Sequence, residues 1–231
     1  MAAFHFCFDL NYFGYFAPRQ HFQLDPFWWV QRTCIVTLFL LCAGMGQAVA
    51  LQAGQRWPRF WRRWAQVAGC AVLVSIGSAM MFPTSWISFG VLHGIAVMLL
   101  IVRLLAPPLL ARGSAGRVAL AALAMLSLAL PRLVHAAFFD TRWTNWVGLV
   151  TRLPRAEDFV PVLPWLGVML LGVLLADGLL RRRPAVLAGE LPPAARPLAV
   201  LGTWSLSFYM LHQPVLIGAI RLYRWATTGQ F

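Results

Sequence analysis

Three histidines lie within or beside strongly apolar stretches of this 231-residue chain, which contains only five histidines in all. They are His5 in HFCFDLNYFG, His93 in SFGVLHGIAVMLL and His212 in SLSFYMLHQPVLIG. An ionisable side chain is costly in a bilayer, so it usually faces the interior of a helical bundle and has a function there. These three side chains therefore predict a polar reaction or transport site that is enclosed by helices.

His5 and Asp9 are four residues apart, a spacing that places both side chains on one face of a helix. A carboxylate that accepts a hydrogen bond from one imidazole nitrogen fixes the tautomer and makes the other nitrogen a better base. The hydroxyl or amine of an acyl acceptor requires such a general base. The same pair is also expected where a helix simply ends at the outer water boundary, and spacing alone leaves both interpretations open.

His93 is flanked by Gly90 and Gly94, which are four residues apart and form a face that another helix or a thin ligand can approach closely. The alternative is a buried histidine that is bonded to a neighbouring backbone carbonyl. We expect His93 to line a substrate-binding cavity.

His212 is followed by Gln213 and Pro214, and a proline within a helix frees the carbonyl four residues earlier. Ser205 and Tyr209 lie on roughly the same helical face as His212. This arrangement predicts a polar seam at mid-membrane, although a purely structural role for the seam is also open. His212 and Gln213 are candidate substrate-binding residues.

Two further charged residues are candidates for substrate binding. Asp158 opens the segment EDFVPVLPWLG, where an acid is favourable at a helix N-terminus on dipole grounds alone. Pro161 and Pro164 predict an irregular start to that helix, of the kind that lines a cavity. Arg32 lies just inside the second apolar segment, where it either snorkels to the surface or pairs with Asp9 or Asp158.

The composition identifies the elements that must hold these residues. Hydrophobic residues make up 60% of the chain and charged residues only 11%, against about 25% in soluble domains, which indicates an integral membrane protein. The net charge of +12 would be typical of a nucleic-acid-binding protein if the arginines formed one patch. They gather instead between apolar segments, as membrane topology requires, so we expect no nucleic-acid partner. The four cysteines lack metal-ligand spacing, and no metal is expected.

A spanning helix needs about 20 apolar residues. We therefore expect an all-α, polytopic transmembrane bundle with about six full spans, which forms a single domain over residues 1–231. Residues 1–16 are too short to span and resemble the second half of a first helix, which predicts a true start upstream of Met1. The expected full spans are residues 28–52, 65–82, 86–106, 117–138, 159–180 and 198–220.

The connecting loops predict the orientation of the spans. If the spans alternate, loops 53–64, 103–117 and 181–197 lie on one side and hold 11 of the 19 arginines. The positive-inside rule makes that side cytoplasmic. Loops 14–27 and 139–158 then face outward.

Five strings in this order and spacing resemble one family: HFCFDLNYFG, FWWVQR…LFLLCAG, FGVLHGIAV, DFVPVLPWLGVMLLG and SLSFYMLHQPVLIG. It is the bacterial branch of the heparan-α-glucosaminide N-acetyltransferase catalytic-domain family, within the transmembrane acyltransferases. The resemblance covers about residues 3 to 222. It implies a multi-pass protein, expected in a bacterial inner membrane, that transfers acetyl from cytoplasmic acetyl-CoA to a sugar or glycan on the far side.

The resemblance also implies a role for His5, because a histidine late in the first helix is the usual catalytic candidate in such enzymes. Asp9 would orient it, while Arg32, His93, Asp158, His212 and Gln213 would bind substrates. The family's Asp…Arg-Gly motif upstream of this histidine is missing here. The short loops leave no large luminal domain, so a bacterial envelope sugar is a better acceptor than heparan sulfate.

The residues alone leave two other functions open. Buried histidines and acids also form proton relays in transporters, although the chain shows no internal repeat of the kind that many transporters have. A non-catalytic membrane scaffold would leave the histidines unexplained. Self-association, the choice between N- and O-acetylation, and the choice between direct transfer and an acetyl-histidine intermediate all stay open.

Overall fold

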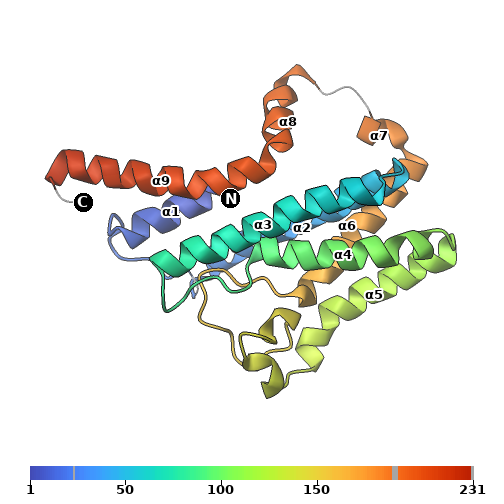
Figure 1. The fold of residues 1–231 in the computed structure, drawn as a ribbon, viewed down its shortest axis with the longest axis horizontal. Coiled ribbons are helices and arrows are strands. Elements are labelled where there is room, and N and C mark those ends of the chain that lie inside the picture. Colours follow the sequence, from blue (N-terminus) through green and yellow to red (C-terminus); the bar gives the residue numbers. More distant parts are fainter. Residues whose placement is uncertain (23, 189–191, 230–231) are drawn as a thin grey trace. The chain divides into compact units, whose positions relative to one another are not determined.

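The computed structural model describes residues 1–22, 24–188 and 192–229, and every regular element in these ranges is helical (Figure 1). Three short 3₁₀ turns, η1 (Ala137–Asp140), η2 (Asn145–Val147) and η3 (Pro193–Ala195), accompany the α-helices. The α-helices are α1 (Ala2–Tyr12), α2 (Pro26–Gln52), α3 (Trp57–Met81), α4 (Val91–Leu110), α5 (Ser114–Leu133), α6 (Val162–Arg182), α7 (Pro184–Ala188), α8 (Arg196–Thr203) and α9 (Ser205–Thr228).

Five helices among the described residues, α2 to α6, are long and apolar enough to cross a membrane. They have between 20 and 27 residues and match five of the predicted spans. The ends agree to within about five residues except at the start of α3, which begins at Trp57 where the prediction placed residue 65. The prediction of a polytopic helical membrane protein is therefore confirmed. Apolar length alone was sufficient to find these helices, because nothing shorter crosses the hydrocarbon core.

The predicted span 198–220 is divided into two helices. Trp204, with φ −101° and ψ 18°, separates α8 from α9, and the two helices run in clearly different directions (Figure 1). The 24-residue α9 is not among the five membrane-length apolar helices. Its serines, His212 and Gln213, together with the arginines near its end, dilute its apolar character. Residues 189–191 of the predicted inner loop lie outside the described residues.

The chain divides into two compact units. We call Thr37–Gly189 the central unit, and Met1–Val36 with Glu190–Phe231 the terminal unit. α4 is the most buried spanning helix of the central unit, with Met98, Val102 and Ala106 fully enclosed. α4 packs against α3, α5 and α6, while the two neighbours α5 and α6 share the most extensive contact.

Glycines let helices of the central unit approach one another closely. A Cβ on Gly172 of α6 would lie 2.3 Å from the carbonyl oxygen of Leu41, and one on Gly44 of α2 would lie 2.0 Å from that of Met169. Both distances are far below van der Waals contact, so α2 and α6 meet backbone to backbone. Packing through small residues is the usual way for helices to associate where no water drives them together.

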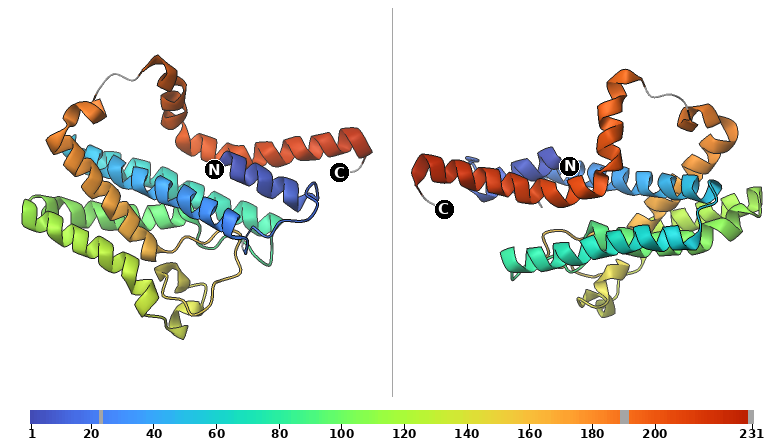
Figure 2. Two further views of the ribbon diagram at one scale, coloured as in Figure 1. Left: turned by 180° about the vertical axis from the view of Figure 1, so that it is seen from behind. Right: turned by 45° about the horizontal axis from the view of Figure 1, so that its top comes forward.

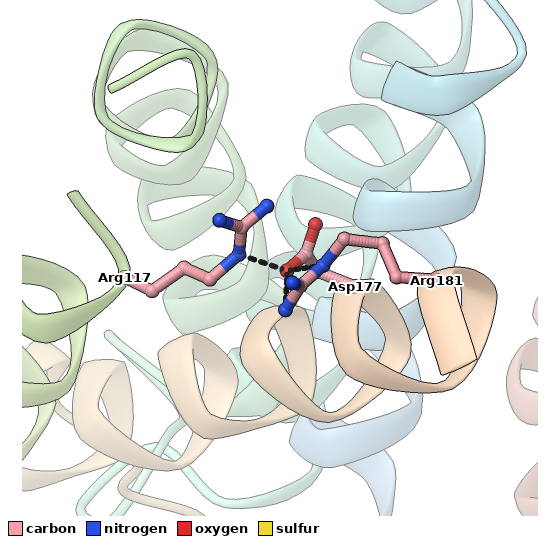
Figure 3. Close-up of polar contacts among 3 residues, drawn as sticks. All are labelled: Arg117, Asp177 and Arg181. Atoms are coloured by element: carbon pink, nitrogen blue, oxygen red, sulfur yellow. Dashed lines mark hydrogen bonds and ion pairs between the residues drawn. The ribbon is translucent and has the colours of Figure 1, made fainter. Parts of the chain in front are cut away.

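An ion-pair cluster links α5 to α6 (Figure 3). The Oδ2 atom of Asp177 lies 2.8 Å from Nε of Arg117 and 3.0 Å from Nη2 of Arg181, one turn further along α6. Figure 3 shows the two guanidinium groups approaching the carboxylate from opposite sides. Asp177 thus connects the ends of two helices that are predicted to be cytoplasmic.

The segment between α5 and α6 is held by Asp140. Its carboxylate accepts hydrogen bonds from the backbone amide of Thr151, at 2.7 Å, and from the hydroxyl of the same residue. These bonds, the hydroxyl first, lower the pKa of Asp140 below the ordinary value. The residue lies outside the spanning helices, in a loop that the arginine distribution predicts to face outward.

In the terminal unit, α1 lies beside α9, as both views in Figure 2 show. His5 contacts His212, and Asp9, further along α1, contacts Gln213, which is further along α9. The two helices therefore run parallel. An aromatic cluster also packs against α1: Phe4 lies edge-on to Phe22, with ring centroids 5.5 Å apart. The predicted topology, in which both segments run from inside to outside, requires this parallel direction.

Candidate active site

The pairing of α1 with α9 brings two of the three singled-out histidines together. Nδ1 of His5 lies 2.7 Å from Nε2 of His212, although the residues are 207 positions apart in the chain. The two rings are stacked, with centroids 4.9 Å apart and an interplanar angle of 23°. His212 is buried, and His5 is partly buried. The expectation that imidazoles converge is confirmed for this pair.

The hydrogen bonds of His212 determine which nitrogen of His5 carries a proton. Nδ1 of His212 lies 2.7 Å from the carbonyl oxygen of Tyr209 and 3.2 Å from that of Phe208. A carbonyl can only accept, so this Nδ1 carries the proton, and Nε2 of a neutral His212 is then an acceptor. His5 must therefore donate from Nδ1, which leaves the lone pair of its Nε2 available as a base or nucleophile.

Asp9 is placed by Gln213 and not by His5. Nε2 of Gln213 donates to Oδ1 of Asp9 at 2.7 Å, and Asp9 is only 3% exposed. The sequence predicted that Asp9 would orient the His5 ring, whereas the structure has Nδ1 of His5 donating a hydrogen bond to His212. α9 lies alongside α1 and offers both Asp9 and His5 a partner at 2.7 Å.

Two acceptor atoms of this cluster are left without a partner. Among the described residues, Oδ2 of Asp9 and Oε1 of Gln213 are buried and accept no hydrogen bond. Buried polar atoms are nearly always paired in proteins, so each exception calls for an explanation. Both atoms are acceptors, so a group that carries hydrogen-bond donors, such as a sugar hydroxyl, an amine or a water, would satisfy them.

His93 lies in the central unit and has its own partners. Its Nδ1 accepts from the backbone amide of Gly90 at 3.3 Å, and its Nε2 lies 3.1 Å from Oγ of Ser75. Because the Ser75 hydroxyl donates to the carbonyl of Ile87 at 2.7 Å, its oxygen accepts from Nε2–H of His93. A neutral His93 thus has both ring nitrogens satisfied and joins α3 to the start of α4.

Asp158 caps the same helix. Its Oδ2 accepts from the amide of Val91, the first residue of α4, at 2.8 Å. A Cβ on Gly90 would lie 2.6 Å from this oxygen, and one on Gly94 would lie 2.7 Å from the carbonyl of Val160. The close approach predicted for the Gly90–Gly94 face is present, and the group that approaches is the segment before α6. Arg32 lies in the first third of α2 and is partly buried.

The candidate residues thus form two clusters, His5–Asp9–His212–Gln213 in the terminal unit and His93–Asp158 in the central unit. Sequence reasoning missed Ser75 and Ser78, which complete the second cluster: the Ser78 hydroxyl accepts from the amide of Ile87 at 3.0 Å. Two serines three residues apart in an apolar span were the available signal. No three His, Cys, Asp or Glu residues are grouped as a metal would require in the part of the chain that the structure describes.

One family model matches almost the whole chain. The model of the family described as heparan-alpha-glucosaminide N-acetyltransferase, catalytic, matches residues 1–214, which include both clusters. No curated protein and no solved structure matched the chain. The match covers far more than half of the chain and agrees with the five membrane-length helices. The chain therefore belongs to the heparan-alpha-glucosaminide N-acetyltransferase catalytic-domain family, and it is a multi-pass membrane protein of the acetyltransferase type.

Proposed function

We propose that this protein transfers an acetyl group from acetyl-CoA on the cytoplasmic side to a sugar or glycan on the opposite side of a bacterial inner membrane. The observation that carries the proposal is the hydrogen bond between His5 and His212, which leaves a basic nitrogen on a partly buried histidine. The family match supplies the reaction type. The positive-inside rule supplies the sidedness of the donor.

The unpaired acceptors support a sugar as the second substrate. Oδ2 of Asp9 and Oε1 of Gln213 would accept from neighbouring hydroxyl or amine groups of the acceptor, which removes the cost of leaving them unpaired. We assign Asp9 to acceptor binding and positioning, with Gln213 as its support. Arg32, Asp158 and His93 are proposed to bind substrates as well. For His93 and Asp158 this would come in addition to their role in holding the start of α4.

The proposed step uses His5 as general base. Nε2 of His5 takes the proton from the acceptor oxygen or nitrogen while that atom attacks the thioester carbonyl carbon. The carbon–sulfur bond breaks, and the same proton passes from His5 to the departing sulfur, so that CoA leaves as its thiol. His212 holds the His5 ring in the required tautomer and supports the positive charge that develops on it. The alternative route passes through acetyl bound to Nε2 of His5.

The test is acetyl transfer by the full chain in vesicles, with labelled acetyl-CoA and envelope glycans as substrates. The variant His5→Ala is expected to lower the turnover about 10²- to 10⁴-fold, the usual contribution of a positioned base. The control is His135→Ala, which removes an exposed histidine from the central unit. Turnover of His5→Ala within twofold of the wild-type rate would refute the role of His5.

A second arm separates the two routes. The protein is incubated with labelled acetyl-CoA without any acceptor and then digested. Label on the peptide that contains His5, absent from the His5→Ala variant, indicates the acetyl-histidine route. If the protein carries no label in the absence of acceptor, yet transfers acetyl fully once the acceptor is added, the transfer is direct.

A further inference from the structure

The central unit contains a pocket at the turn between α2 and α3, and its lining includes none of the residues that the proposed acetyl transfer uses. Its volume is about 470 Å³, which is within the range of sites for small organic ligands. One wall is the turn itself, and the other is the last part of α4. The lining residues are Leu51, Gly54, Gln55, Trp57, Arg103, Leu104, Pro107 and Pro108.

Arg103 is the charged group of this pocket and is only 6% exposed. Its Nη2 donates to the backbone carbonyl of Gln55, and its guanidinium carbon lies 5.0 Å from the ring centroid of Trp57 and 5.4 Å from that of Phe60. Within the described residues, Arg103 forms no ion pair, and its Nη1 is buried without a hydrogen-bond partner. The side-chain oxygen of Gln55 is also buried and unpaired.

A buried charge normally has a counter-ion, because removing a charge from water is costly unless another charge or several hydrogen bonds replace the water. The two aromatic rings and one carbonyl compensate only part of the charge and the hydrogen-bonding capacity of the guanidinium group. An anion at Nη1 of Arg103 would complete it, and a guanidinium fork matches the oxygens of phosphate particularly well. The pocket is also much larger than a single ion, so the anion should carry a further group.

The two prolines indicate what that further group contains. Pro107 and Pro108 lie inside α4 and lack backbone N–H groups, so the carbonyls four residues earlier, at Arg103 and Leu104, lose their helical partners. Carbonyls freed in this way can accept hydrogen bonds from hydroxyl groups. Arg56 in the turn after α2, and Arg59, Arg62 and Arg63 near the start of α3, add a favourable electrostatic potential for an anion.

We propose that this pocket binds the phosphate of a phosphate ester that carries hydroxyl groups, with Arg103 as the principal contact. Two sources offer this chemistry: a soluble ribonucleotide and the headgroup of an anionic phospholipid such as phosphatidylglycerol. The pocket lies at the end of the spans where the arginine distribution predicts the cytoplasm, and both sources are available there. The site binds its ligand whether or not the acetyl transfer proposed above is correct.

The test uses the full chain in phosphatidylcholine nanodiscs and two probes. ADP binding is measured with labelled nucleotide, and phosphatidylglycerol binding is measured by native mass spectrometry after mixed-lipid reconstitution. Arg103→Gln removes the charge, and it is expected to weaken the binding of one probe at least tenfold, because it deletes a charge-assisted hydrogen bond. Gln55→Glu keeps Arg103 but supplies an internal carboxylate that pairs with Nη1 in place of the ligand. It should weaken the binding of the same probe by a similar factor without destabilising the fold.

The control is Arg59→Gln, which removes one charge from an exposed position beside the pocket and should change the affinity less than twofold. Loss of ADP binding in Arg103→Gln and Gln55→Glu identifies a soluble ester, and loss of phosphatidylglycerol retention identifies a lipid headgroup. Binding of both probes that is unchanged by Gln55→Glu, or that falls equally in Arg59→Gln, overturns the proposal.

Discussion

Replacing His212 tests whether the tautomer of His5 is set by its neighbour on α9. In His212→Ala, the Nδ1–H group of His5 loses the acceptor that lies 2.7 Å away. A buried donor left without a partner costs about 1–3 kcal/mol, which corresponds to roughly 5- to 150-fold in rate if the whole effect falls on the transition state. We expect this loss in kcat, with the KM for acetyl-CoA nearly unchanged, because His212 acts through His5.

The double variant His5→Ala/His212→Ala makes the test quantitative. If His212 acts only through His5, the second substitution adds nothing once His5 is absent, and the double variant has the rate of His5→Ala alone. His212→Gln retains a carbonyl acceptor and should recover part of the rate that His212→Ala loses. The assay is the initial rate of acetyl transfer in vesicles. Independent, additive losses in the double variant, or a His212→Ala rate within twofold of wild type, would refute the reasoning.

Three further predictions concern residues that support the fold, and they are tested by unfolding in detergent or by hydrogen exchange. Gly172→Ala should destabilise the protein by about 1–3 kcal/mol, because its Cβ would lie 2.3 Å from a carbonyl oxygen of α2, whereas Gly69→Ala, which meets nothing within 4 Å, should not. Asp158→Asn should cost about 0.3–1 kcal/mol through the weaker cap of α4, and an unchanged midpoint would contradict that role. The lowered pKa of Asp140 means that its bonds to Thr151 stabilise the loop above about pH 4, the ordinary carboxyl value, and are lost as the pH falls through the lower folded-state pKa. Hydrogen-exchange protection of residues 140–152 should therefore fall in acid in the wild type and be low at every pH in Asp140→Asn.

The spans were predictable from the sequence because their signal is local. A run of about 20 apolar residues has few alternatives to a spanning helix. The start of α4 was less predictable: the expected span began at residue 86, and Asp158, expected at the N-terminus of the helix that follows it, caps α4 at Val91 instead. The break at Trp204 was not predictable, because no proline or glycine pair marks it and the helix resumes immediately.

The candidate site was predictable in its residue types but not in its pairing. His5, Asp9, His212 and Gln213 were identified because polar groups in apolar segments are unusual. Their partners depend on the contact between α1 and α9, which no local pattern encodes. For the same reason, a site at Arg103 was not predicted. In the sequence it is one more arginine beside an inner loop, and only the structure shows its hydrogen bond to the turn after α2.

The long chain separation between His5 and His212 has a consequence for biosynthesis. The first imidazole leaves the ribosome early, and its partner follows only after 207 further positions, which include all five membrane-length helices. A nascent chain therefore holds His5 without this partner until α9 has been made. Under the proposed mechanism, acetyl transfer begins only when α9 arrives, so activity can report on complete assembly.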